Sequence, residues 1–452
     1  MSDRFLMCCV TLMCLSYSAY SQADDLTTIV ARALDRDAEL AQARAADVAA
    51  RQAIPIARAA LLPQVSGGWG RGYNEIKTDG FPNQHYWQSG WTVQATQPLF
   101  DWSKWTAYQQ ADYIAAQGTV ALARARQSAM LKAVRAYFDE LAAEDELTRT
   151  TDYLAAIDNQ REQVRRKRAA GEATLIDQRD VEVTREQAQI QQADAQQDLA
   201  LKRRMVEQIS GTAFATLASL PAVMPLPRLN PDNPDAWSDQ ARASGYDVQA
   251  KQLELEIARM ESKKARAAHY PVVALTGSYT PAGAASGYAR PTTTTTAMLQ
   301  ITIPLYSGGE VQARLKQTLA LEDSAQQSVE AASMKAEASA RENYAQYFKA
   351  RVRADSLARL LGTSRDALAA TQQGLIVGSR TQVDVLRAID MVDTTRRDLT
   401  RSRYEAIVAL LQLKADAASL DWEDIQQANA LLSDAKLRAG LSEQHAPHAL
   451  AP

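Results

Sequence analysis

Cysteine and histidine are both scarce in this chain. Of 452 residues, only three are cysteine and four are histidine. The cysteines are Cys8, Cys9 and Cys14, all close to the N-terminus. The histidines are His85, His269, His445 and His448, scattered without the spacing of a metal-binding motif. We therefore expect neither a disulfide framework nor a metal site, and we assign no catalytic residues and no cofactor.

The chain also lacks an excess of charge of either sign. Its formal net charge is -3 and its isoelectric point is about 6.0, which excludes the basic surface of a nucleic-acid-binding protein. Aromatic residues make up only 6% of the chain, whereas alanine and glutamine are abundant. Such a composition favours long helices with narrow, small-residue seams over a thick globular core.

No Walker-type lysine motif is present, so energy for any transport must come from a partner. A glycine-rich run at 67–72 precedes no helix, and close packing of a strand explains it better than a phosphate loop does.

A single apolar run, at residues 5–15, lies near the N-terminus. It follows Arg4 and is followed by small and polar residues up to Ala23, which is the order of charge, apolar stretch and cleavage site in a secretory signal peptide. A membrane anchor needs about 20 apolar residues, more than this run offers. We expect residues 1–23 to be the signal peptide, with cleavage after Ala23 preferred over Ser21; a lipid anchor on Cys14 is the alternative. Because no later segment is apolar enough for a spanning helix, an exported chain of this kind is soluble in the periplasm, secreted, or an outer-membrane β-barrel.

The rest of the chain is an internal repeat with a spacing of about 207 residues. Four landmarks recur in order. They are Ala-Arg-Ala-Ala-x-x-Pro at 57–63 and 265–271, Pro-Leu-aromatic at 98–100 and 304–306, Tyr137 and Tyr344, and Gly-x-x-Thr-x-x-Asp at 171–177 and 378–384. A proline-rich linker at 221–234 separates the halves. We predict repeats at 24–220 and 235–420 and a C-terminal segment at 421–452 whose tail is disordered.

Each repeat has the same predicted order of elements: a helix, two strands, and a long helical hairpin. The strands are expected at about 64–76 and 87–98, and again at about 272–281 and 294–304. Long helices without proline follow at 103–168 and 310–373, and second helices return to about Gly211 and Ala418. Asp101 and Ser307 are predicted N-caps, the latter in a capping box with Glu310. The fold class is therefore mainly α with a small β part, built from internally duplicated long helical hairpins.

The predicted strands alternate between apolar and polar residues. Leu299, Ile301 and Ile303 share one face, with polar residues opposite, and the other strands follow the same period of two. The aromatic residues expected at a membrane interface are Trp69, Tyr86, Trp87 and Trp91, beside Tyr73. An ordinary half-buried sheet would also carry such residues. The pattern favours strands that face outer-membrane lipid.

Four strands cannot close a barrel, and open sheet edges are not tolerated in lipid. The smallest membrane barrels use about eight strands, so several copies must combine if these strands span a membrane. Three copies would give a 12-stranded transmembrane β-barrel above a tube of twelve helices, an α-barrel.

The turns of the two hairpins carry a resemblance to a known family. The segment 377–386 (VGSRTQVDVL) and its first-repeat counterpart 170–177 (AGEATLID) resemble the helical turns of the TolC family of outer-membrane efflux proteins. The resemblance covers nearly the whole mature chain. It implies a homotrimer, and an exit duct for a tripartite efflux pump or type I secretion system. It also implies a periplasmic adaptor and an inner-membrane transporter as partners. A periplasmic coiled-coil adaptor or scaffold is the alternative, but such proteins usually have one hairpin where this chain has two.

The same resemblance assigns roles to residues at the turns. It implies that Asp177 pairs with Arg380 to close the periplasmic entrance, and that Asp384 lies on a ring of carboxylates facing the pore. The predicted adaptor contacts are Gly171, Glu172, Ala173, Gly378 and Ser379. Arg387 stands where the family member most like this chain carries a second gate aspartate, a departure that argues against a doubled acidic ring and against strong cation selectivity. An ordinary ion pair between Asp384 and Arg387 at i,i+3 is the alternative.

Overall fold

A computed structural model describes residues 24–77, 79–80, 82–214, 216–221, 226–281 and 293–432. The predicted signal peptide, 1–23, and the predicted disordered tail lie outside these residues. The chain forms two compact units. Of the described residues, those within 24–40, 126–241 and 337–432 belong to the helical unit, and those within 41–125 and 242–336 to the strand-bearing unit. Each unit contains parts of both sequence repeats, and the division into two repeats stays a prediction.

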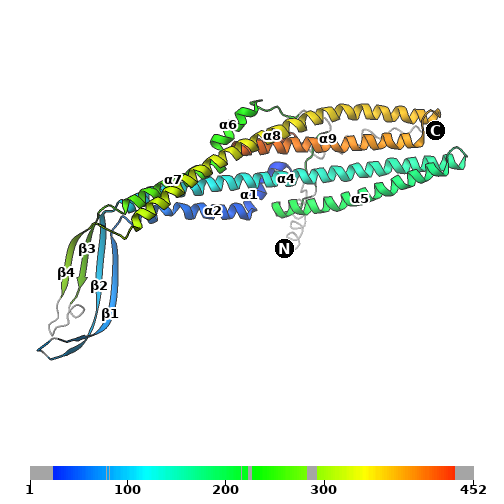
Figure 1. Ribbon diagram of the computed structural model, residues 1–452. Helices are drawn as coiled ribbons and strands as arrows, with labels where there is room; N and C mark the ends of the chain where they lie inside the picture. Colours follow the sequence, from blue (N-terminus) through cyan, green and yellow to red (C-terminus); the bar gives the residue numbers. More distant parts are fainter. Residues whose placement is uncertain are drawn as a thin grey trace, which may run out of the picture. The chain divides into compact units, whose positions relative to one another are not determined.

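Helices make up most of the described residues (Figure 1). They are α1 (Leu26–Arg36), α2 (Ala38–Arg51), α3 (Ala53–Ala59), α4 (Trp102–Ala169), α5 (Leu175–Ser210), α6 (Pro234–Ser244), α7 (Tyr246–Ala267), α8 (Glu310–Ile376), α9 (Gln382–Asp416) and α10 (Trp422–Ala430). None of the helices in these ranges combines the length and the apolar composition of a membrane span.

The two longest helices confirm the expected hairpins. α4 has 68 residues and α8 has 67, so at 1.5 Å per residue each extends about 100 Å. Neither contains proline, and so no helical hydrogen bond is interrupted by a missing donor. Asp101 caps α4 as predicted, because its Oδ1 accepts a hydrogen bond from the backbone N–H of Lys104 at 3.0 Å. The second hairpin starts differently.

The predicted capping box at the start of α8 is wrong. This helix begins at Glu310, and Gly308 and Gly309 before it have positive φ angles of 63° and 88°. The backbone N–H of Glu310 donates to the carbonyl oxygen of Ser307 at 3.1 Å, so Ser307 contributes a backbone turn and not a side-chain cap. Two glycines allow this left-handed turn at little cost, and the sequence pattern Ser-x-x-Glu did not take them into account.

The strands form one antiparallel sheet in the order β1-β2-β3-β4 (Figure 1). They are β1 (Gln64–Ile76), β2 (Gln84–Phe100), β3 (Val272–Thr280) and β4 (Thr294–Thr302). Each is at least 9 residues long, near the 9–11 residues that a tilted strand needs to cross a bilayer. β2 pairs with β3, so the central ladder joins the first sequence repeat to the second. β1 and β4 are the edge strands.

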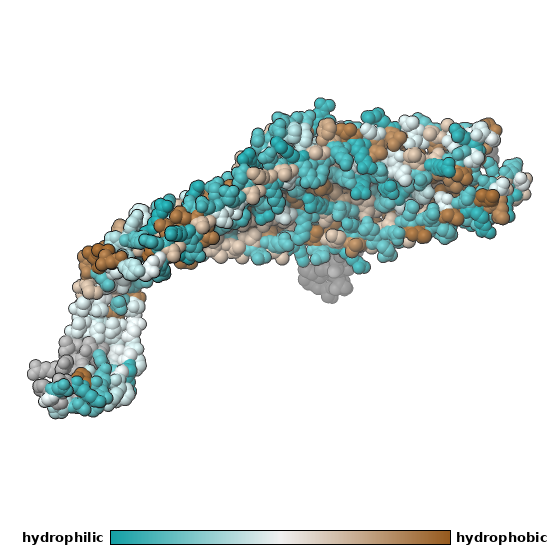
Figure 2. Space-filling view, in the orientation of Figure 1, coloured by the Kyte–Doolittle hydropathy of each residue, from teal (hydrophilic) through white to brown (hydrophobic). Residues whose placement is uncertain are grey.

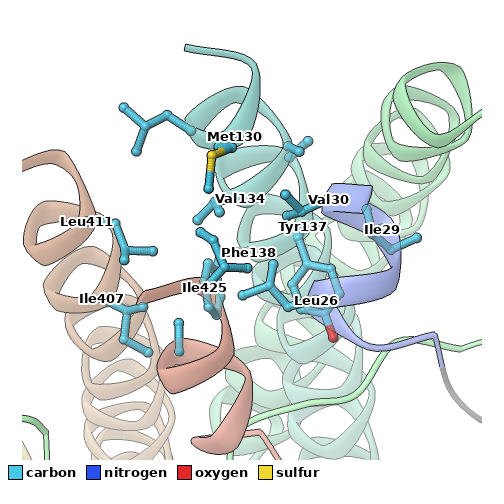
Figure 3. Packing of buried hydrophobic residues seen from close by; sticks show 14 of the residues in the cluster. Leu26, Ile29, Val30, Met130, Val134, Tyr137, Phe138, Ile407, Leu411 and Ile425 are labelled. Atoms are coloured by element: carbon cyan, nitrogen blue, oxygen red, sulfur yellow. The ribbon is translucent and has the colours of Figure 1, made fainter. Parts of the chain in front are cut away.

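The core of the helical unit lies where α1 and α10 pack on the middle of the hairpins (Figure 3). α1 presents Leu26, Ile29 and Val30, spaced to lie on one helix face. Figure 3 shows Tyr137 and Phe138 of α4 between these residues and Ile425 of α10. The whole side chain of Tyr137 is buried, and its hydroxyl donates to the carbonyl oxygen of Ala218 at 2.6 Å. Burial raises the pKa of this phenol, which stays neutral.

The start of α1 is fixed by residues distant in the sequence. Asp24 forms a parallel bridge with Leu217. The backbone N–H of Leu26 donates to Oδ1 of Asn429 at 3.0 Å, and Nδ2 of Asn429 donates to Asp25 at 3.0 Å. Both ends of the described chain therefore meet in this core.

Replacing Gly211 with alanine is expected to destabilise the helical unit. Gly211 ends α5 with a φ of 73°, and a Cβ atom there would collide with the guanidinium of Arg36. The left-handed conformation alone costs an alanine about 1–2 kcal/mol. Gly362→Ala, in the interior of α8 where a Cβ would meet nothing within 4 Å, is the control and should be neutral or stabilising by up to about 1 kcal/mol. Thermal unfolding in detergent measures both; equal melting temperatures for the two variants would contradict the assigned contact.

Candidate functional site: the hairpin turns and the sheet

Both hairpins turn at a glycine, as the sequence predicts. Gly171 and Gly378 have φ angles of 81° and 77°, a conformation that suits glycine and few other residues. Around the turns, large apolar side chains remain exposed to solvent in the single chain. These are Leu175, Ile176, Ile376 and Val377. The two turns therefore offer apolar and small residues at the ends of the hairpins.

A capping box follows each turn. Thr174 accepts from the backbone N–H of Asp177 at 3.1 Å, and Asp177 accepts from the backbone N–H of Thr174 at 2.9 Å. Thr381 and Asp384 repeat this arrangement at 3.2 and 2.9 Å. The conserved spacing Thr-x-x-Asp between the two repeats is thus a helix-start signal in both. The predicted gate carboxylates, Asp177 and Asp384, therefore cap the starts of α5 and α9. The spacing Thr-x-x-Asp was the sequence signal from which this capping role could have been recognised.

These hydrogen bonds set the charge state of the two carboxyls. The side-chain and backbone hydrogen bonds of Thr174 lower the pKa of Asp177. The backbone and side-chain hydrogen bonds of Thr381 lower the pKa of Asp384, and Arg380 and Arg387 lower it further through their charges. Both carboxyls are therefore ionised at neutral pH.

The predicted pair of Asp177 and Arg380 does not form within the chain. Asp177 is bonded to Thr174, while the backbone N–H of Arg380 donates to the carbonyl oxygen of Gly374 at 3.2 Å. Nor does an ion pair join Asp384 to Arg387 in the part of the chain that the structure describes, although the positive charge of Arg387 is felt by Asp384. A contact between Asp177 and Arg380 would have to join two copies of the chain.

The predicted adaptor-contact residues lie together on the two turns. Glu172 is exposed, and its backbone N–H donates to the carbonyl oxygen of Lys167 at 2.8 Å. Ala173 is half-buried beside it. In the second turn, Ser379 is exposed, and both its backbone N–H and its hydroxyl donate to the carbonyl oxygen of Gly374. The backbone of each turn is therefore fixed by hydrogen bonds within the turn, and the side chains of Glu172 and Ser379 remain accessible from outside.

Sequence reasoning missed a row of polar contacts between α4 and α9, which belong to different hairpins. We call this row the α4–α9 seam. It consists of Asp145 with Tyr404, Arg149 with Asp393, Asp152 with Arg396, and Gln160 with Gln382. No local pattern pairs residues more than 200 positions apart, so the seam was out of reach of the sequence alone.

The apolar residues of the sheet share one face, as expected. In the register, Trp69 lies opposite Trp91, Leu275 opposite Leu299, and residues opposite each other point to the same face. Trp69, Trp87 and Trp91 are all exposed on this face. In Figure 2 the visible face of the sheet is mostly pale, the colour of intermediate hydropathy, and turns hydrophilic towards the loops at its end.

Tyr86 departs from the predicted aromatic set. It lies opposite Asn74, one position out of phase with Trp87, so it belongs to the polar face of the sheet. Trp87 instead contacts Tyr73, with ring centroids 5.3 Å apart, and Arg71 lies 4.6 Å above its ring. The apolar-face aromatics are therefore Trp69, Tyr73, Trp87 and Trp91, with Tyr279 packed on Trp91 at 5.7 Å.

Among the described residues, no three His, Cys, Asp or Glu side chains are grouped to hold a metal ion. What the structure offers is a duplicated pair of long hairpins attached to an amphipathic sheet with two unpaired edges. An apolar sheet face bounded by two unpaired edges is the arrangement expected of a sheet that further copies complete in a membrane.

Comparison with known proteins agrees with this class. The family model of the outer membrane efflux proteins matches residues 29–212 and 237–418, one segment in each repeat. The chain is 27% identical to outer membrane protein TolC of Vibrio cholerae over 92% of this chain and 95% of that one. It is 26% identical to the protease secretion protein PrtF of Dickeya chrysanthemi over 89% and 90% of the two chains.

A solved structure shares the fold. The outer membrane protein VceC of Vibrio cholerae superposes with a TM-score of 0.77 at 16% identity, covering 88% of this chain and 96% of that one. The chain belongs to the outer membrane efflux protein family. Its location is the outer membrane.

The capping boxes generate a prediction for the turns. Thr174→Ala should destabilise the start of α5 by about 1 kcal/mol, because it removes the acceptor for the N–H of Asp177. Thr174→Ser keeps the hydroxyl and serves as the control. Hydrogen exchange of the Asp177 amide measures the effect, and equal protection in the two variants would show that the box does not hold the turn.

The same boxes make the turns sensitive to acid. Both carboxyls have folded pKa values below the usual 3.8, so their hydrogen bonds stabilise the turns above that pH and are lost as the pH falls through the lowered values. We expect protection of the amides of Thr174 and Thr381, which donate to these carboxylates, to be constant from pH 7 to 5 and to fall below about pH 4. Exchange rates corrected for intrinsic pH dependence test this, and a loss already complete at pH 5 would point to another group.

Proposed function

We propose that this chain is the outer-membrane exit duct of a tripartite efflux pump or a type I secretion system. Three copies would form a 12-stranded β-barrel and an α-helical tube that reaches into the periplasm. The duct is a passive conduit, and no catalytic step or cofactor is part of its function. A periplasmic adaptor and an inner-membrane transporter would open it and supply the energy.

The observation that carries this proposal is the sheet with its two open edges. In the part of the chain that the structure describes, β1 and β4 each have one side without a partner strand, although all four strands have membrane-spanning length. Unpaired backbone groups are not tolerated in lipid, so β1 of one copy must pair with β4 of another until the barrel closes. Three sheets of four strands give twelve, an even number within the range of such barrels. The match to efflux and secretion proteins over nearly the full length supports the same function.

The gate is proposed at the ends of the hairpins. Since Asp177 and Arg380 do not pair within one chain, we place their contact between neighbouring copies. Asp384 and Arg387 would then lie near the axis, as alternating acidic and basic groups. Gly171, Glu172, Ala173, Gly378 and Ser379 would receive the tips of the adaptor, with the exposed apolar residues of the turns beside them.

The assembly is tested by purifying the protein from outer membranes in detergent. Native mass and scattering should give an elongated trimer, and insertion into planar bilayers should give single-channel currents. A protein that is monomeric or dimeric without detergent and conducts no current would refute the duct and favour a periplasmic scaffold.

Arg380→Ser should raise the single-channel conductance of the resting duct. The substitution removes the cation that would link two copies at the entrance, while the backbone bonds of the turn remain. Arg365→Ser, on the exposed face of α8 away from the turn, is the control. Conductance equal to wild type in both variants would count against a lock at Arg380.

Asp384→Asn should weaken the preference of the channel for cations over anions. It removes a carboxylate that is ionised at neutral pH, while its amide can still accept the Thr381 hydrogen bond. The reversal potential in a salt gradient measures this preference. An unchanged reversal potential would place Asp384 away from the pore.

A further inference from the structure

The α4–α9 seam contains a buried arginine that two carboxylates share. Arg149 of α4 is only 5% exposed, and it contacts Glu146 on its own helix at 2.6 Å. Its other guanidinium nitrogen donates to Asp393 of α9, whose side chain is 11% exposed. We call these three residues the Arg149 cluster. It is the most buried ionic contact between the two hairpins among the described residues.

The cluster differs from the other ionic contact of the seam. Arg396 and Asp152 lie 2.7 Å apart, but their side chains are 42% and 59% exposed. An exposed pair of this kind contributes little, because water and salt screen it. Separating the helices at Arg149 would, in contrast, leave the buried carboxylate of Asp393 without its cation, with an uncompensated desolvation penalty, whereas Arg149 would keep Glu146 of its own helix. Separating α4 from α9 at Arg149 is therefore opposed far more strongly than separating them at Arg396.

The internal repeat shows that the cluster is not a general feature of these helices. At a spacing of about 207 residues, Arg149 corresponds to Ser356, Glu146 to Arg353, and Asp393 to Glu186. None of these reproduces a buried arginine between two acids. The contact is thus specific to the seam where the first hairpin meets the second inside one chain.

A cavity of about 550 Å³ lies against the cluster. Its lining includes Tyr153 and Asp152 of α4 and Ile389, Asp393 and Arg396 of α9. Burial and the neighbouring carboxylates Asp390 and Asp393 raise the pKa of Tyr153 to about 12, so this side chain stays neutral beside the cluster. The packing between α4 and α9 is therefore open on one side of the ionic contact, and side chains there have space into which to move.

We propose that the Arg149 cluster is a lock between the two hairpins of each chain, which holds the duct in its resting conformation from a position above the turns. The inference rests on the proposed function of the chain as a duct that opens. Opening the periplasmic entrance requires the ends of the hairpins to move apart, and within one chain the seam between α4 and α9 resists that movement at Arg149. The side chains that the family resemblance assigns to this task, Asp177 and Arg380, do not contact each other within the chain.

The test compares single-channel recordings of the purified trimer with two variants of the cluster. Arg149→Met and Asp393→Asn should each shift the equilibrium between low and high conductance by roughly tenfold towards the high level, a common size for such coupling. Arg396→Met is the matched control, because it removes the exposed ion pair of the same seam, and it should leave the recording unchanged. The double exchange Arg149→Asp with Asp393→Arg again places one cation against two acids and should restore the resting conductance.

The outcomes separate this inference from the proposed function. Absence of channels in the wild-type protein would refute the duct itself. Wild-type channels together with unchanged conductance in Arg149→Met and Asp393→Asn would overturn the lock, and a lower melting temperature alone would then give the cluster a purely structural role. If Arg149→Met does not assemble, Asp393→Asn and the double exchange still decide: equal recordings from both would refute the lock.

Discussion

The structure depends first on the hydrogen-bonding needs of the backbone at the two edges of its sheet. Each of β1 and β4 has a row of N–H and C=O groups that no other strand within the described residues satisfies. In water such an edge invites aggregation, and in lipid it is forbidden. The apolar residues of all four strands share one face of the sheet. Edge-to-edge association of several copies in a ring would pair the backbone groups of β1 and β4 and would also place every apolar side chain on the lipid side. Because β2 leads into α4 and β4 leads into α8, a ring of sheets would also arrange the hairpins in a ring.

The two hairpins are similar in sequence and length, but the side-chain contacts that each makes with the rest of the chain differ. Both turns have a left-handed glycine and a Thr-Asp capping box, so the local stability of the turns is matched. The longer-range contacts are not matched. At the repeat spacing, Ser356 stands at the position of Arg149, so the second repeat has no counterpart of this arginine. A tube built from near-equivalent helices can thus have seams of unequal strength, and movement will be confined to the weaker ones.

Most of the fold could be predicted from the sequence because its signals are local. The helices α4 and α8 were placed within about three residues by the absence of proline and by the glycines at 171 and 378. Strand faces followed from alternation, with Tyr86 the exception, since a cluster of aromatics was given more weight than its phase. The start of α8 was wrong because two glycines outweighed a Ser-x-x-Glu pattern. The site was less accessible. Asp177 and Asp384 were recognised as important by resemblance, and their bonds to Thr174 and Thr381 could have been recognised from the local Thr-x-x-Asp spacing. The contact of the buried Arg149 with Asp393 joins residues 244 positions apart, and no single segment encodes it.

The contact of α1 with α10 has a consequence for how the protein is made. Leu26 is hydrogen-bonded to Asn429, 403 residues further along the chain, and the same core also needs Tyr137 and Leu217. Contacts so distant in sequence form late, since the intervening chain must be ordered first. A protein that is exported from its N-terminus onwards cannot complete this core until nearly all of its residues have crossed the inner membrane. During that interval the apolar face of α1 can pack on α4 and α5, but its contact with α10 is missing. Completion of this core therefore waits for α10, which follows α1, α4 and α5 in the chain and supplies Ile425 and Ala428.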